Sequence, residues 1–165
     1  MKNFLERLLD VLNWIGTWFP QLTVRALLAW EFWESGVEKY YGDNWFANIQ
    51  DKFMFPFNIV PTDISWFIAT WFELVGALLL LIGLGTRFVS VSLIILTIVA
   101  IHAVHWPAEW SSFSELLQGY SISKTEFGNY KLPLIYLVLF TVPLFIGPGK
   151  LSLDHLVWGR RRRYN

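Results

Sequence analysis

The sequence predicts an all-α integral membrane protein: a four-helix bundle with a short amphipathic helix at its N-terminus. Composition is the first reason. Of the 165 residues, 55% are apolar, 18% are aromatic and 16% are charged, whereas about 25% are charged in an average soluble domain. Length is the second reason, because four spans of about 20 residues each would use most of the chain. We therefore expect a single membrane domain over residues 1–165.

The first segment, residues 1–16, has the pattern of an amphipathic helix. Phe4 and Leu8 belong to an apolar face, and Glu6 and Asp10 lie opposite. Such a helix lies in the plane of the membrane interface; the alternative is a polar lead-in to the first span, and both interpretations stay open. Acidic residues precede any apolar run and no small-residue cleavage site follows, so we do not expect a cleavable signal peptide.

Four apolar segments have the length of a membrane span: about 19–38, 63–83, 87–105 and 130–147. Pro20 suits the first turn of the first helix, and Pro107 ends the third. Two loops rich in polar and aromatic residues, 39–62 and 106–129, are then expected on one side of the membrane.

The basic residues predict the orientation. One side of the membrane carries more of them than the other: Lys2, Arg7, Arg87, Lys150 and Arg160–Arg163 against Lys39, Lys52, Lys124 and Lys131. By the positive-inside rule, both termini of this multi-pass protein are expected in the cytoplasm. A net charge of zero gives no reason to expect a nucleic-acid partner.

The first predicted span is unusual because its apolar sequence contains ionisable residues. Glu31, Glu34 and Glu38 share one face of a helix, with Glu31 and Glu38 only about 20° apart, and Arg25 lies further toward the N-terminus. At mid-bilayer each ionisable side chain costs about 2.5–3.5 kcal/mol or more, so such residues face a bundle interior and usually pair. We therefore expect a buried polar seam along this helix.

Helix geometry, at about 1.5 Å per residue, predicts which ionisable residues share a depth in the membrane. Arg25 and Glu73 are expected to meet near the midplane. A second group is expected in the outer third: Glu31, Glu34, His102 and His105. The first pair is interpreted either as a structural ion pair that fixes helix register or as part of a functional site. The second group either reaches toward water at the interface or serves as a proton relay, a carboxylate–imidazole metal site or a haem-ligating site.

Aromatic residues suggest where a flat molecule would bind. Most Trp and Tyr residues fall where interfacial belts are expected. Trp30, Trp33 and Trp71 lie deeper and are candidates for lining a pocket for a ring such as a quinone. The chain has no Cys, so any redox role needs a cofactor or a partner.

Several short motifs occur in a distinctive order. They are Arg25 with Gly36-Val-Glu-Lys39, Glu73-Leu-Val-Gly76, Gly83-Leu-Gly-Thr86-Arg87, and Gly147-Pro-Gly-Lys-Leu-Ser-Leu-Asp154. Together they resemble the DoxX/DoxD family of small four-helix bacterial membrane proteins, from about residue 20 to 155. The Trp- and Glu-rich first helix and the long aromatic loop look more like the DoxX-type proteins encoded beside copper-binding ribosomal peptides, the HvfX or bufferin-type clusters.

The resemblance implies a quinone-linked oxidoreductase component of the bacterial inner membrane, serving a redox or metal-peptide maturation pathway together with a protein partner. The family includes a subunit of thiosulfate:quinone oxidoreductase, but no residue here indicates a thiosulfate site. The catalytic candidates are Glu73, Arg25, Glu31 and His102. The cofactor-binding candidates are Trp30, Trp33, Glu34, Trp71 and His105. The metal-binding candidates are His102, His105, Glu31 and Glu34. The alternative is a non-enzymatic scaffold or metal-handling partner in a copper or oxidative-stress complex; homo-oligomer formation stays open.

Overall fold

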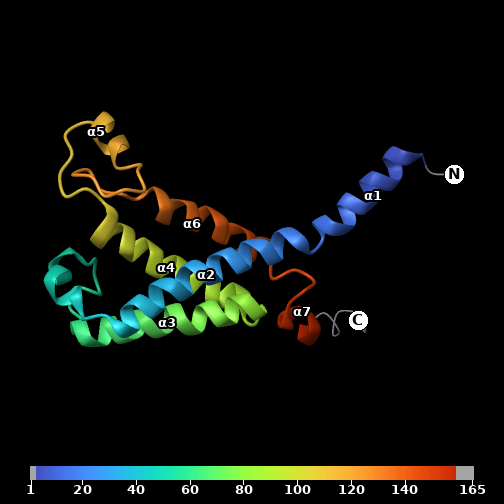
Figure 1. Ribbon diagram of the computed structural model, residues 1–165. Helices are drawn as coiled ribbons and strands as arrows, with labels where there is room; N and C mark the ends of the chain where they lie inside the picture. The colour runs from blue at the N-terminus through green and yellow to red at the C-terminus, as the bar shows by residue number, and fades with distance from the viewer. Residues whose placement is uncertain (1–2, 159–165) are drawn as a thin grey trace.

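A computed structural model describes residues 3–158 and shows an all-helical protein (Figure 1). The elements are α1 (Phe4–Gly16), α2 (Phe19–Tyr41), the 3₁₀ segment η1 (Trp45–Lys52), α3 (Thr62–Ile82), α4 (Thr86–Ala100), its π-helical continuation η2 (Ile101–His105), α5 (Phe113–Gln118), α6 (Lys131–Thr141), its π-helical continuation η3 (Val142–Ile146), and α7 (Leu153–Trp158). Within residues 3–158 the only β-type pairing is an isolated bridge between Thr125 and Gly128, and there is no β-strand. The all-α prediction is confirmed.

Helices occupy all four predicted spans, with ends that differ from the predicted ones by at most three residues. Two of them, Thr62–Ile82 and Thr86–His105, are long and apolar enough to cross a membrane, with mean hydropathies of 1.9 and 2.2. The segment Lys131–Ile146 is a shorter apolar helix. The outward surface is also apolar: Phe67 is 62% exposed and Phe88 is 73% exposed. Such a surface is unusual for a protein in water and suits contact with acyl chains.

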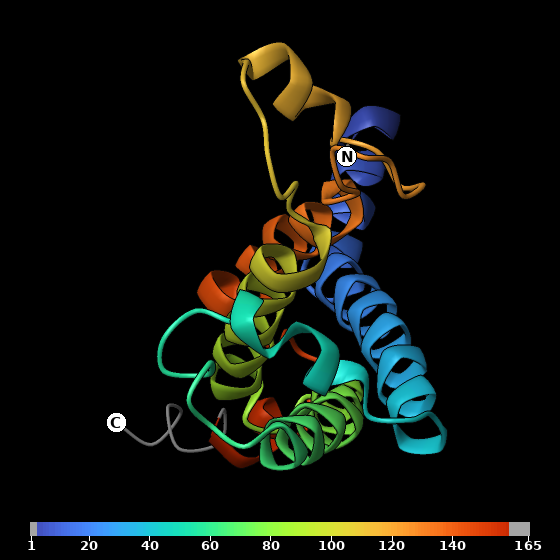
Figure 2. The same cartoon turned by 90° about the vertical axis from the view of Figure 1, so that its left-hand side faces the viewer.

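The four long helices form a ring of neighbours. Contacts run from α2 to α3, from α3 to α4, from α4 to α6, and from α6 back to α2 (Figure 2). At the centre, one side chain from each helix is fully buried: Leu28, Leu80, Leu93 and Phe140. Phe32 packs edge-on against Phe140, with 5.4 Å between ring centroids. The apolar core is therefore shared by all four helices.

Small residues bring neighbouring helices close together. A Cβ atom at residue 36 would lie 2.9 Å from Leu74 Cγ and 3.1 Å from Leu74 N. At residue 76 it would lie 3.2 Å from a methyl group of Leu93. Close approach over small residues is a principal source of helix association in membranes. Gly36 thus sets the distance between α2 and α3, and Gly76 the distance between α3 and α4.

The N-terminal helix α1 extends away from the bundle (Figure 1). Asn3 caps it, with a reciprocal pair of hydrogen bonds between Asn3 and Glu6. None of its residues is buried, and Phe4 is 78% exposed. A helix is therefore present in the predicted range, and its location in the membrane interface stays a prediction.

The two long loops lie together at one end of the bundle, opposite α1 and α7 (Figure 1). The first loop packs through Phe46 and Phe53 against Ala69 of α3 and Ala103 of η2. Trp66 meets Phe46 edge-on, with ring centroids 5.0 Å apart. We call this the loop end, and the opposite end of the bundle the termini end. Lys2 and the predicted anchor Arg160–Arg163 lie outside the described residues.

The close contact at Gly36 leads to a stability prediction. Gly36→Val should lower the free energy of unfolding in detergent by about 1–3 kcal/mol, because the added methyl groups overlap Leu74 and push α2 from α3. Gly16→Val is the matched control, since a Cβ atom at residue 16 meets nothing within 4 Å. Equal stability of the two variants, measured by denaturant titration, would contradict this view of the α2–α3 contact.

Candidate functional site

A buried ion pair joins α2 to α3 toward the loop end. Lys39 Nζ lies 2.8 Å from Glu73 Oε2 and 3.1 Å from Oε1, and donates a further hydrogen bond of 2.8 Å to Ser35 Oγ. Only 13% of the Lys39 side chain and 10% of the Glu73 side chain are exposed. Each charge therefore has its partner in a place where water supplies little of the solvation it needs.

The predicted pairing of Arg25 with Glu73 is wrong, because Glu73 pairs with Lys39. The sequence predicts that the first span ends at about residue 38, which leaves Lys39 in the loop that follows. In the structure α2 continues to Tyr41, and Lys39 projects from its last turns toward α3. Arg25 lies level with Leu80 instead, seven residues or about 10 Å further along α3 than Glu73.

Arg25 is fully buried at the termini end of the bundle. Its Nη1 donates to the Leu80 carbonyl at 3.4 Å and its Nε to the Gln21 carbonyl at 3.4 Å, while Nη2 donates to the Leu151 carbonyl. Asp154 lies near enough to attract the guanidinium electrostatically. Arg25 therefore connects the start of α2, the end of α3 and the segment before α7.

The turn between α3 and α4 is shaped around that guanidinium. Gly83 has a φ of 71°, and a Cβ atom there would lie 2.0 Å from Arg25 Nη1. The Asp154 carboxylate accepts hydrogen bonds from the backbone N–H groups of Gly85 and Thr86, at 2.8 and 2.9 Å. An acidic group suits this position because the first N–H groups of a helix have no partner within the helix.

Glu31 pairs with a residue that the sequence analysis did not identify. Its carboxylate accepts a hydrogen bond from the Tyr136 hydroxyl on α6, and the Tyr136 ring packs beside Phe32 with centroids 6.1 Å apart. The available signal was a single phenol in the apolar run Lys131–Thr141. Glu34, one turn along α2, is exposed. Of the predicted seam residues, Glu31 is therefore joined to α6, whereas Glu34 and Glu38 are exposed, so the three do not form one buried seam.

The two histidines bind loop residues. His102 Nδ1 lies 3.0 Å from the Lys52 carbonyl, and His105 Nδ1 lies 2.8 Å from Asn129 Oδ1. Both belong to the π-helix η2, whose wider turns no longer place residues i and i+3 on one face. Among residues 3–158, no three or more His, Cys, Asp or Glu side chains form a group able to hold a metal. The predicted grouping of these histidines with Glu31 and Glu34 is not formed.

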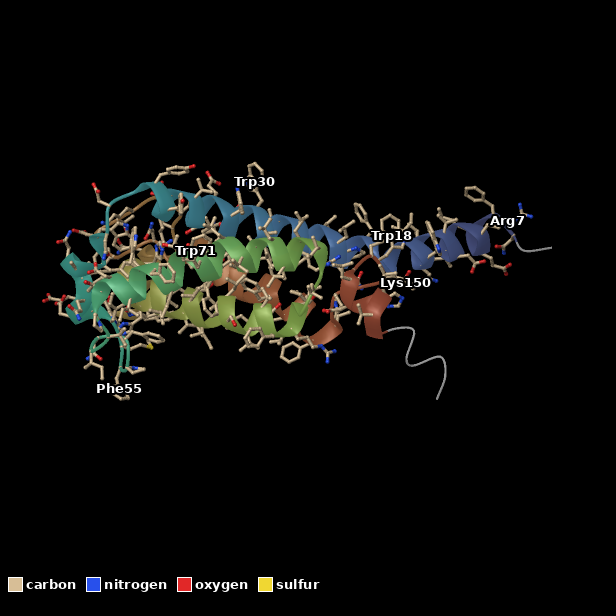
Figure 3. The ribbon with its side chains drawn as sticks, turned by 90° about the horizontal axis from the view of Figure 1, so that it is seen from below. Arg7, Trp18, Trp30, Phe55, Trp71 and Lys150 are labelled. Atoms are coloured by element: carbon tan, nitrogen blue, oxygen red, sulfur yellow. The ribbon has the colours of Figure 1, made fainter. Side chains whose placement is uncertain are left out.

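Of the three candidate tryptophans, Trp71 has the most distinctive surroundings. Trp30 is 67% exposed and points away from the bundle (Figure 3), and Trp33 is 40% exposed. Trp71 meets Tyr40 of α2 almost at a right angle, with ring centroids 6.1 Å apart. It also lines an apolar groove of about 270 Å³ between α3 and α4, which includes Val75 and Phe88. Trp71 therefore contacts the ring of Tyr40, the neighbour of Lys39 in the sequence, and also forms part of the wall of this groove.

Comparison with known proteins identifies the family of this chain. The DoxX family matches residues 21–106, a range that includes Arg25, Lys39 and Glu73. The chain belongs to the DoxX family. An uncharacterized protein of Haemophilus influenzae is 46% identical over 143 residues, which is 87% of this chain and 86% of that protein. No solved structure matches.

Membership in DoxX makes this a membrane protein. Three of the motifs noted in the sequence meet at one place in the structure. Arg25, the turn Gly83–Arg87 and the segment Gly147–Asp154 are all joined by the contacts of the Arg25 guanidinium and the Asp154 carboxylate. These three motifs at the termini end thus build one connected polar cluster.

That cluster leads to a prediction for this DoxX protein. Arg25→Met should lower the free energy of unfolding by about 3 kcal/mol, because the buried Leu80 carbonyl, the Leu151 carbonyl and the Asp154 carboxylate lose their cationic partner. The segment before α7 should also become more sensitive to limited proteolysis. Arg7→Met, on the exposed helix α1, is the control and should change neither measurement. A stable Arg25→Met variant with a protected C-terminal segment would contradict the anchoring role.

Proposed function

We propose that this protein is a quinone-linked component of a membrane redox system, in which the Lys39–Glu73 pair meets the quinone head group. The buried ion pair beside a lipid-exposed aromatic surface is the observation that carries the proposal. Reduction of a quinone to a quinol takes up two electrons and two protons. Proton donors held within the apolar part of the membrane are therefore needed, and Lys39 and Glu73 are ionisable groups in such a place.

The surroundings of the pair suit a flat, apolar ligand. Tyr40, next to Lys39 in sequence, presents its ring to Trp71, and aromatic rings favour offset or edge-on contacts with a further ring. The apolar groove lined by Trp71 and Val75 would receive part of an isoprenoid tail. The Lys39 ammonium would donate a hydrogen bond to a quinone carbonyl and pass a proton to it as the ring is reduced. Glu73, which holds the ammonium in place, would then take up a proton from water and pass it to the Lys39 amine, and the second proton would follow the same route.

Further ionisable groups would connect the pair to water at the loop end. Glu38 is exposed on α2, and its charge acts on Glu73. The Glu31 carboxylate, which accepts a hydrogen bond from the Tyr136 hydroxyl, is a second ionisable group that joins two helices. Because the chain has no Cys, the electrons would come from a protein partner or its bound metal, in keeping with the resemblance to proteins of copper-peptide maturation. We place the protein in the inner membrane with both termini in the cytoplasm.

A scaffold function is the second candidate, and the loop end favours it. Phe113 is 69% exposed and Ile122 is 60% exposed in the second loop, which lies outside the four long helices. Exposed apolar side chains of this kind suit contact with a partner protein. This function requires no quinone, and it predicts that changes in the loops abolish partner association while Glu73→Gln is tolerated.

Quinone binding tests the proposal directly. In detergent micelles, quenching of Trp fluorescence by a short-chain quinone should saturate for the wild-type protein. Glu73→Gln should weaken this binding about 10- to 100-fold, because the Lys39 ammonium loses a charge-assisted hydrogen bond that positions it. Asp43→Asn is the matched control: it removes an exposed carboxylate just beyond the end of α2 and should leave the affinity within about twofold, since exposed charges contribute little.

Two further measurements make the result decisive. Trp71→Phe should remove most of the saturable quenching, whereas Trp30→Phe should not, because Trp30 points away from the bundle. Circular dichroism should show that every variant is folded and inserted. Wild-type affinity in folded Glu73→Gln would refute the role of the ion pair, and the absence of saturable quenching in the wild type would favour the scaffold.

A further inference from the structure

A second, more open pocket lies at the termini end, away from the ion pair. It has a volume of about 640 Å³ and lies between the start of α2, the start of α4 and the segment that follows η3. Gln21 contributes from α2, Arg87 and Phe88 from α4, and Ile146 and Lys150 from the other side. Figure 3 shows Lys150 at this end of the molecule. The quinone proposal does not use this pocket.

The charge of the pocket is mainly positive. Arg87 makes one long hydrogen bond, 3.4 Å from Nη2 to the Phe145 carbonyl, and within residues 3–158 neither Arg87 nor Lys150 has a carboxylate at ion-pair distance. Asp154 also lines the pocket, but its oxygens accept hydrogen bonds from Gly85 and Thr86, and it faces the buried cation Arg25. Two cations are thus available to a ligand, while the carboxylate is already occupied.

The other wall of the pocket is apolar and open. Phe88 is 73% exposed and Ile146 is 66% exposed. Phe88 lies in the first turn of α4, and Ile146 is the last residue of η3, so both mark the ends of apolar helices. If these helices span the bilayer, the pocket lies at the boundary between hydrocarbon and water, with cations on its polar side and rings or methyl groups on its lipid side.

We propose that this pocket binds an anionic phospholipid. The phosphate diester would lie between the side chains of Arg87 and Lys150, and an acyl chain would run over Phe88 and Ile146. A free phosphate would use the two cations but not the apolar wall, and a zwitterionic lipid would bring its own positive charge against them. The bound lipid would hold the Gly147–Lys150 segment to the start of α4, next to the cluster of Arg25 and Asp154.

The experiment compares lipids that differ in head group alone. The full-length protein is placed in nanodiscs of phosphatidylcholine or of phosphatidylcholine with phosphatidylglycerol, with identical acyl chains. The wild-type protein should unfold at a higher temperature with phosphatidylglycerol and should retain that lipid in native mass spectra. The double variant Arg87→Gln with Lys150→Gln should bind it about 30-fold more weakly, from about one factor of five for each cation near an anionic surface.

The double variant Lys52→Gln with Lys124→Gln is the control. It removes the same number of cations from the loop end and should bind phosphatidylglycerol as the wild type does. If removal of both pocket cations unfolds the protein, Lys150→Gln alone, in an exposed segment, should still give about a fivefold loss. A wild-type affinity in folded pocket variants, or an equal loss in the control, would overturn the proposal.

A further arm distinguishes the lipid from its phosphate. Inorganic phosphate is added at millimolar concentration to the protein in phosphatidylcholine nanodiscs. No stabilisation by phosphate, together with stabilisation by phosphatidylglycerol, is the expected result. Equal stabilisation by both, lost in the pocket variant, would assign the site to a free anion and overturn the assignment to a lipid.

Discussion

A charge that is buried among membrane helices must find its partner there, and α2 has charged residues along most of its length. Arg25 is held by backbone carbonyls of α3 and of the segment before α7. Glu31 is held by Tyr136 of α6, and Lys39 by Glu73 of α3. These partners lie on α3, on α6 and on the segment before α7. The solvation of α2 therefore fixes how the other helices are positioned around it.

Apolar contacts hold the helices together, and the polar contacts decide which helices become neighbours. Leu28, Leu80, Leu93 and Phe140 meet at the centre of the ring, and Gly36 permits the close approach that brings Lys39 within reach of Glu73. In a membrane, apolar side chains gain little by leaving lipid, so close packing and polar pairing decide which helices associate. The α2–α3 interface combines both effects, and the site that we assign to the quinone belongs to it.

The two ends of the bundle differ in chemistry. The loop end combines aromatic residues with the ion pair and with exposed apolar side chains in the second loop, features that suit an electron-transfer partner and a flat ligand. The termini end combines Arg25 and Asp154 in a structural cluster with the open, basic pocket of Arg87 and Lys150. Phe88 lines both the groove beside Trp71 and the basic pocket, but the charged groups of the two proposed sites lie at opposite ends and can be altered separately.

The sequence by itself determined the all-α class, the membrane character and the helix positions, because these depend on local composition and periodicity. It also identified Arg25 and Glu73 as residues whose burial requires a partner. Only the tertiary structure decided the partners. A three-residue extension of α2 brought Lys39 to Glu73, the helix offset placed Arg25 beside Leu80, and the π-helix η2 turned His102 and His105 toward separate loops. Pairing depends on where helices end and how they are offset, and residue spacing along one helix contains no information on either.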